Sequence, residues 1–386
     1  MKQSVLFILF GLAAVSGPLF HPSLFFPSLP LFLSEAISQP GVTAFVSVLA
    51  GSGHPGLQDG ASRSARFHWP TGMAADRHGN WFIADYGNHV IRQINQFGIV
   101  TTFAGRGAGG FSDGIGRVAM FNGPNAIAID RDGNLFVSDA GNFRIRKVAP
   151  NGQVTTFAGS GSEGNNEGPA LQAEFIYPAG VALDRTGALY VADRGAHRIK
   201  RISPEGIVMI TAGTGEPGNV GGTGVLAKFH DPVGIAIDEV DNIYIADSGS
   251  HTIRRIDQAG VVITVAGSGS PGYRDGLREQ AQFSRPTGVV LDREGNLIVT
   301  DSGNQRIRKI KLPEGRVTTL AGNGRRSNLN GPAGAAGFDS PTGIYADPLG
   351  QIYIADSANH QIRWLTLGPF PVALSAFLQI RNQGRF

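Results

Sequence analysis

Three side-chain types that can carry chemistry return at a fixed spacing along this sequence. The first is an aspartate whose copies stand 54 or 55 residues apart: Asp85, Asp139, Asp193, Asp247, Asp301 and Asp356. Six carboxylates in register could bind a cation, but an aspartate also accepts hydrogen bonds from the turn that follows it. Because a function rarely needs six identical copies, we interpret this set as stabilising turns.

A histidine follows the repeated aspartate by four residues in four of the copies. These are His89, His197, His251 and His360, whereas Phe143 and Gln305 take the same position in the other two copies. Imidazoles are common metal ligands. Equivalent positions in a ring of repeats lie too far apart to share one ion, so we expect each imidazole to pack between repeats with one nitrogen hydrogen-bonded. We predict no metal site and no cofactor.

A basic residue follows the aspartate by seven positions. The set is Arg92, Arg146, Lys200, Arg254, Arg308 and Arg363. Such a set could attract phosphate or RNA, but its periodicity matches that of the aspartates and therefore predicts ion pairs within or between repeats. The chain has 33 Lys plus Arg against 30 Asp plus Glu, a formal net charge of +3, so nucleic acid is not predicted as a partner.

The elements that position these residues are four short strands in each copy. The first strand begins at a proline and has a small residue two positions later; the prolines are Pro70, Pro124, Pro178, Pro232, Pro286 and Pro341. A hairpin of the form Asp-x-x-Gly-Asn leads into a continuous apolar run such as "WFIAD". "DRDGN" at residues 130–134 resembles the start of a calcium loop but lacks the later Glu, so we interpret it as one of these hairpins.

The last copy lacks its fourth strand, and the missing piece stands before the first copy as "FVSVLAG", residues 45–51. The six copies of four short strands predict an all-β fold, a six-bladed β-propeller of four-stranded antiparallel blades over residues 42–367, and the displaced strand predicts that the ring is closed. The N-terminal strand would complete the last blade and close the ring. A linear solenoid is the alternative, but it would leave exposed sheet edges.

The segments "ADYGNHVIR", "ADSGSHTIR" and "ADSANHQIR" resemble the NHL repeat, with Val, Ile or another residue where the family has Leu. The resemblance covers residues 42 to about 367, and the linking pattern is most similar to the teneurin-type and bacterial secreted branches. It implies a six-bladed propeller that binds a ligand or interacts with proteins. The scaffold carries many functions, so it implies little about chemistry.

The ends of the chain differ from the repeats. Residues 1–41 combine an apolar run from Val5 to Val15 with a Pro- and Phe-rich stretch, and Ser16 or Ala36 would suit cleavage of a signal peptide. We therefore expect an extracytoplasmic protein, secreted or periplasmic; the alternative is an uncleaved N-terminal membrane anchor. The chain has no Cys, so it has no disulfides. Residues 368–386 form an apolar tail to which we assign no role.

The alternative to a binding module is a propeller enzyme of the lyase or lactonase type. Such six-bladed enzymes hold a metal near the axis with ligands at the openings of the inner strands. Here those positions are Thr71, Asn125, Ala179, Val233, Thr287 and Thr342, none of them acidic or histidine. We therefore identify no catalytic residue and predict a binding role, with the enzyme as the alternative.

The two residues before each repeat proline vary although the rest of the repeat is strict. Antiparallel connections place these pairs at the same end of the ring as the turns after the repeated aspartates. Positions that vary between otherwise strict repeats can hold the side chains of a specific binding site. Loop positions that are under no constraint also vary, however. We predict a site for a protein or small-molecule ligand on a monomeric propeller, formed by His68, Trp69, Tyr177, His230, Asp231, Arg285 and Asp339.

Overall fold

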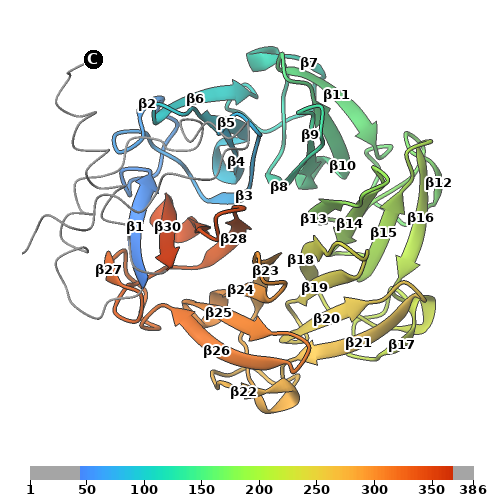
Figure 1. The fold of residues 1–386 in the computed structure, drawn as a ribbon. Helices are drawn as coiled ribbons and strands as arrows, with labels where there is room; N and C mark the ends of the chain where they lie inside the picture. Colours follow the sequence, from blue (N-terminus) through green and yellow to red (C-terminus); the bar gives the residue numbers. More distant parts are fainter. Residues whose placement is uncertain (1–43, 368–386) are drawn as a thin grey trace, which may run out of the picture.

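Six antiparallel sheets stand around a central axis in the computed structural model, which describes residues 44–367 (Figure 1). This arrangement confirms the six-bladed propeller. The proposed signal peptide and the apolar tail lie outside the described residues. Within residues 44–367, no helix has both the length and the apolar character needed to cross a membrane.

Each blade runs from an innermost strand at the axis to an outer edge. The innermost strands are β3 (Pro70–Ala75), β8 (Pro124–Ile129), β13 (Pro178–Leu183), β18 (Pro232–Ile237), β23 (Pro286–Leu291) and β28 (Pro341–Ala346). The second strands are β4 (Trp81–Asp85), β9 (Leu135–Asp139), β14 (Leu189–Asp193), β19 (Ile243–Asp247), β24 (Leu297–Asp301) and β29 (Ile352–Asp356). The third strands are β5 (Val90–Ile94), β10 (Arg144–Val148), β15 (Arg198–Ile202), β20 (Thr252–Ile256), β25 (Arg306–Lys311) and β30 (Gln361–Leu367).

The outer part of each blade differs from the prediction by one strand. The fourth strands are β6 (Ile99–Ala104), β11 (Gln153–Ala158), β16 (Ile207–Ala212), β21 (Val261–Ala266), β26 (Arg316–Ala321) and β1 (Ala44–Ala50). A fifth strand of two residues pairs beyond each of them: β2 (Gly60–Ala61), β7 (Gly114–Ile115), β12 (Gly168–Pro169), β17 (Gly222–Thr223), β22 (Gly276–Leu277) and β27 (Gly331–Pro332). The Gly-rich loops between blades therefore fold back and cover the edges of their sheets.

Short 3₁₀ turns complete the described elements. Four lie between the second and third strands: η2 (Tyr86–Asn88), η4 (Ala140–Asn142), η7 (Ser302–Asn304) and η8 (Ser357–Asn359). Three follow the fifth strands: η3 (Gly116–Val118), η5 (Gly224–Leu226) and η6 (Arg278–Gln280). The first group lies beside the residues that precede the prolines, because the Gly87 N–H donates to the His68 carbonyl at 2.8 Å. We call this end of the ring the proline rim.

The ring closes as the sequence predicts. Strand β1 pairs antiparallel with β30, with Ala44 opposite Leu367 and Val46 opposite Leu365. It lies between β30 and β27, so it is the fourth strand of the sixth blade. Figure 1 shows the two differently coloured strands side by side. The first and last strands of the described chain thus share one sheet.

Small residues allow the six inner strands to crowd around the axis. A Cβ built on Gly180 would lie 2.1 Å from the Val233 carbonyl oxygen, and one on Gly343 would lie 2.0 Å from that of Thr71. Outside this ring, apolar clusters fill the spaces between blades, as where Trp81 packs on Tyr353 with ring centroids 4.1 Å apart. Radial packing therefore gives each sheet cover that it lacks alone.

Candidate functional site

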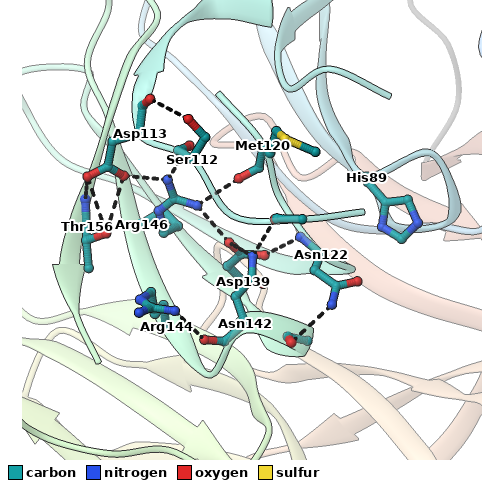
Figure 2. A network of polar contacts seen from close by, with 12 residues as sticks. His89, Ser112, Asp113, Met120, Asn122, Asp139, Asn142, Arg144, Arg146 and Thr156 are labelled. Carbon is teal, nitrogen blue, oxygen red and sulfur yellow. Dashed lines mark hydrogen bonds and ion pairs between the residues drawn. The ribbon is translucent and has the colours of Figure 1, made fainter. Parts of the chain in front are cut away.

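The proline rim is held by a buried network that Figure 2 shows in the second blade. Arg146 donates to the Asp139 carboxylate at 2.8 Å, and also to Asp113 at 2.5 Å. Asp139 accepts two further hydrogen bonds, from the Asn142 side chain at 2.8 Å and from the Asn122 backbone N–H at 2.7 Å. The aspartate therefore ties the rim residue to the turn and to the third strand.

The same pair of charges recurs in every blade, which confirms the prediction that the acidic and basic sets pair. The distances are Arg92–Asp85 2.9 Å, Arg146–Asp139 2.8 Å, Lys200–Asp193 2.8 Å, Arg254–Asp247 3.4 Å, Arg308–Asp301 2.7 Å and Arg363–Asp356 2.7 Å. All twelve side chains are fully buried. Each cation also faces a buried phenylalanine ring; in the first blade, the Arg92 Cζ atom lies 5.0 Å from the centroid of the Phe67 ring. These residues are therefore structural.

The aspartates differ from the prediction in their partners. Asp85 accepts from the Asn88 side chain in its own turn, but its other oxygen accepts the backbone N–H of His68, 17 residues earlier. Burial raises the pKa of Asp85 to about 6, although Arg92 favours the charged form. The carboxylate thus anchors the first residue of the varied pair as well as its own turn.

The repeated histidines connect one blade to the next. The Nδ1 atom of each imidazole accepts the backbone N–H of the residue before the next proline: His360 from Trp69 at 3.2 Å, His89 from Gly123 at 3.0 Å, His197 from Asp231 at 3.1 Å and His251 from Arg285 at 3.0 Å. Gln305 does the same for Ser340 through its side-chain oxygen at 2.6 Å. This confirms that the imidazoles are structural and rest between blades.

The third blade shows what happens without this acceptor. Phe143 takes the histidine position before it, and its side chain has no nitrogen or oxygen that could accept a hydrogen bond. The Tyr177 N–H donates instead to Asp193 at 2.9 Å. Trp69 has a φ of +54° and Arg285 a φ of +50°, whereas Tyr177 is not among the residues with positive φ. The residue before the proline therefore has a left-handed backbone where the preceding blade supplies a side-chain acceptor for its N–H, and not where that acceptor is missing.

These contacts explain why the pairs before the prolines vary. The fold uses the backbone N–H of both residues, one held by the aspartate of its own blade and the other by the preceding blade. The side chains of Trp69 and Arg285 are not needed for either contact, and both residues are exposed. The proline rim can therefore change its side chains at little cost to the ring.

A cavity of about 860 Å³ opens at the axis, surrounded by all six inner strands. Its mouth on the proline rim has polar and aromatic side chains: Trp69, Tyr86, Tyr177, Arg194, Arg285 and Arg326. Each inner strand contributes one apolar residue, three positions after its proline, to a ring around the cavity: Met73, Ile127, Val181, Ile235, Val289 and Ile344. The cavity thus has a polar mouth above an apolar wall.

The structure distributes the seven predicted site residues over two positions. Trp69, Tyr177 and Arg285 line the mouth of the cavity. The other four lie behind it: Asp231 pairs with Arg194 at 3.3 Å, Asp339 lies 3.8 Å from Arg326, and His68 and His230 pack edge-on against His360 and His197. A role of these residues in binding stays a prediction.

Three residues at the mouth were not predicted. Tyr86 and Arg194 follow the repeated aspartates, where the other copies have Ala or Ser. The variation that singles out the pairs before the prolines also marks this position, and the two positions share a rim. Arg326 belongs to the loop between β26 and β27, where no repeat pattern indicates its place.

The mouth carries more positive than negative charge. Arg194 and Arg326 have carboxylates within 4 Å, but within residues 44–367 Arg285 has none. The hydroxyls of Tyr86 and Tyr177 lie 3.2 Å apart, and burial together with Tyr86 raises the pKa of Tyr177. Tyr177 therefore stays protonated at neutral pH. No described group of three or more His, Asp or Glu side chains is arranged to hold a metal ion.

The histidine contacts predict a pH effect on stability. Burial, with the Arg285 guanidinium and His230 nearby, lowers the pKa of His251 below its ordinary value of 6.5. The folded protein favours the neutral ring, so this stabilisation is present above about pH 6.5 and is lost as the pH falls. Replacing His251 by Gln, which mimics Gln305, should reduce the fall in melting temperature between about pH 7.5 and about pH 5.5.

Buried carboxyls such as Asp85 have an opposite effect, because a raised pKa in the folded state increases stability as the pH falls. This effect is the same in wild type and variant, so it cancels when the two are compared. His251→Phe serves as the control, because it removes the acceptor and should lower the melting temperature at every pH. An unchanged pH profile in His251→Gln would contradict the assignment of Nδ1 as an acceptor.

The repeat pattern matches a known family. The model described as "NHL repeat" matches residues 121–148, 175–202, 229–256, 283–310 and 338–365, which are equivalent segments of blades two to six. The chain is an NHL-repeat propeller. Segment 67–94 occupies the same place in blade one and has the same strands and the same buried Asp–Arg pair.

Curated relatives of this NHL-repeat propeller include larger proteins. The chain is 32% identical over 280 residues to protein SUPPRESSOR OF QUENCHING 1, chloroplastic, of Arabidopsis thaliana, covering 68% of this chain and 26% of that protein. It is 31% identical over 333 residues to NHL repeat-containing protein 2 of Bos taurus, covering 75% and 46%. Teneurin-m of Drosophila melanogaster is 26% identical over 348 residues, covering 79% and 12%. The chain spans less than half of each relative.

Two solved structures illustrate the range of proteins that share the fold. An auxiliary nutrient binding protein from Bacteroides thetaiotaomicron aligns with a TM-score of 0.65 and 18% identity, covering 84% of this chain and 76% of that one. A streptogramin B lyase aligns with a TM-score of 0.51 and 14% identity, covering 86% and 100%. At these identities the likeness shows the fold alone.

Proposed function

We propose that this NHL-repeat propeller is a binding module whose ligand enters the axial cavity from the proline rim. The observation that carries the proposal is the coincidence of two features: the cavity mouth, and the positions at which the repeats differ. Trp69, Tyr177 and Arg285 belong to both. A cavity of about 860 Å³ is also within the range of small-molecule sites, about 300–1,000 Å³.

A small molecule is the ligand class that the geometry favours over a protein partner. The mouth is concave and leads into an apolar space that a side chain or a whole small ligand can fill. All six blades of one chain supply the wall, so we propose that a single ring suffices for binding. The described lining contains no carboxylate and no imidazole, so the cavity offers groups for binding rather than an acid–base pair.

The test is binding by a variant with an altered mouth. Trp69→Ala combined with Arg285→Ala should weaken binding of a co-purifying ligand, identified by native mass spectrometry, about tenfold or more, or about 1.4 kcal/mol. The melting temperature should change little, because both side chains are exposed and the hydrogen bonds that hold these residues use their backbone N–H groups. The matched control is Arg131→Ala with Arg293→Ala on the opposite rim, and equal loss in both variants would contradict the proposal.

A lyase or a lactonase would consume its ligand. A panel of lactones separates this alternative from a binding module. Turnover at the cavity would be lost in the mouth variant and kept in the opposite-rim control. Turnover of any panel member with that pattern would replace the binding proposal by the enzymatic one.

We also propose that the protein acts outside the cytoplasm. The support is the apolar N-terminal segment followed by small residues, which lies outside the described structure. A fusion of residues 1–41 to a reporter that is active only after export tests this proposal. Reporter activity in the membrane fraction alone would favour the alternative of an uncleaved anchor.

A further inference from the structure

The wall and the mouth of the cavity differ in the chemistry that they offer. Below the mouth, the ring that contains Met73, Ile127 and Val289 is apolar, and Leu183, Ile237 and Leu291 extend this surface towards the opposite rim. A ligand that fills this space must bring an apolar body, because a polar one would lose its hydrogen bonds to water there.

Three hydroxyl groups near the mouth are already hydrogen-bonded within the protein. Thr71 donates to the Asn125 carbonyl at 2.7 Å, and Ser357 donates to the Pro70 carbonyl at 2.6 Å. Thr287 lies within 3.3 Å of the Pro341 carbonyl. These side chains join neighbouring blades, and each hydroxyl has only one proton, so none is left to donate to a ligand. These three hydroxyls are therefore not available as donors to a ligand.

Guanidinium groups are the charged donors at the mouth. Arg194 is balanced by Asp231 and Arg326 by Asp339, both of which lie behind the mouth. Arg285 is exposed and has no carboxylate within 4 Å among residues 44–367, although its backbone is fixed by His251. One positive charge at the mouth is therefore left for a ligand to neutralise, in a geometry suited to a planar or tetrahedral oxyanion.

From the apolar wall and the unbalanced arginine at its mouth, we propose that the cavity binds an organic anion with an extended apolar body. The carboxylate, sulfate or phosphate group lies at Arg285, and the apolar body descends along the ring of inner strands. This inference rests on the proposed function and specifies its ligand class.

The test compares three probes of equal chain length below their micellar concentrations: decanoate, decanol and decyltrimethylammonium. Binding to the full chain is measured by calorimetry and by protection of Trp69 from quenching by acrylamide. Trp69 is a suitable reporter because it is 44% exposed, whereas Trp81 and Trp364 are each 6% exposed. Decanoate is expected to bind at least about tenfold more tightly than decanol, with the cation weakest, and added salt should weaken only decanoate.

Two further comparisons test where the anionic group and the alkyl chain of the probe bind. Arg285→Gln should remove most of the preference for decanoate over decanol, whereas Arg293→Gln on the opposite rim should keep it. Dodecanoate should bind about tenfold more tightly than decanoate, because two more methylenes enter the apolar wall.

The outcomes separate this inference from the proposed function. Equal binding of decanol and decanoate, tightest binding of the cation, or an unchanged preference in Arg285→Gln would overturn the anionic ligand. If none of the three probes protects Trp69 but compounds of another class do so, the ligand class is wrong and the binding module stands. If no small molecule protects Trp69 and the mouth variant leaves ligand binding unchanged, the proposed function itself fails.

Discussion

A chain that lacks residues 1–50 is expected to lose the closed ring, because the sixth blade then has no fourth strand. Val46, Val48 and Leu49 are at most 8% exposed in β1, and burial of such a side chain is worth about 1.5–3 kcal/mol. The strand also pairs with both β30 and β27. The combined loss approaches the whole stability of a typical domain, about 5–15 kcal/mol.

Thermal unfolding of this truncated chain should be compared with that of a chain lacking only residues 1–41. A synthetic peptide of residues 42–51 added in trans should restore part of the melting temperature, since it can pair with β30. Equal melting temperatures of the two truncations would show that β1 does not close the ring.

Replacing Arg308 by Met is expected to lower the free energy of unfolding by about 3–5 kcal/mol. Arg308 is fully buried and donates to Asp301 at 2.7 Å and to Asp275 at 2.6 Å. Its removal leaves the Asp301 carboxylate buried without its cation, which is the costly way to break such a pair. Chemical denaturation measures the loss.

Two variants make this prediction specific. Arg308→Lys should be milder than Arg308→Met, because Lys200 fills the same position in the third blade and keeps its aspartate at 2.8 Å. Combining Arg308→Met with Asp301→Asn should cost less than the sum of the two single changes. Arg293→Met, on the exposed opposite rim, should stay within about 0.5 kcal/mol. Additive losses would mean that the two charges do not depend on one another.

Periodicity made the scaffold predictable. The aspartates, basic residues and prolines recur at one spacing, so a single pairing rule holds in all six blades, and the displaced N-terminal strand indicated closure. The two-residue fifth strands were missed because pairs such as Gly114–Ile115 have no alternation to detect. The backbone partner of Asp85, 17 residues earlier, depends on how blade and loop pack, which local turn patterns do not contain.

The residues at the cavity mouth were predictable only at positions where the six repeats differ. Trp69, Tyr177 and Arg285 were found because their positions vary while their neighbours do not. Tyr86 and Arg194 carry the same signal but follow an aspartate that had been interpreted as structural. Arg326 reaches the mouth through tertiary packing of a Gly-rich loop, and its neighbours in sequence give no indication of that direction.

The pairing of β1 with β30 also determines how the ring responds to force. Ala44, where β1 begins, lies opposite Leu367, where β30 ends, so the chain enters and leaves the described ring at one point. Tension on these two ends peels the strands apart one hydrogen-bonded pair at a time instead of loading all the pairs together. A pull on both ends would therefore open the propeller at its sixth blade at low force. A pull applied to any other blade would need more force, because no strand of those sheets is a chain end that can be peeled away.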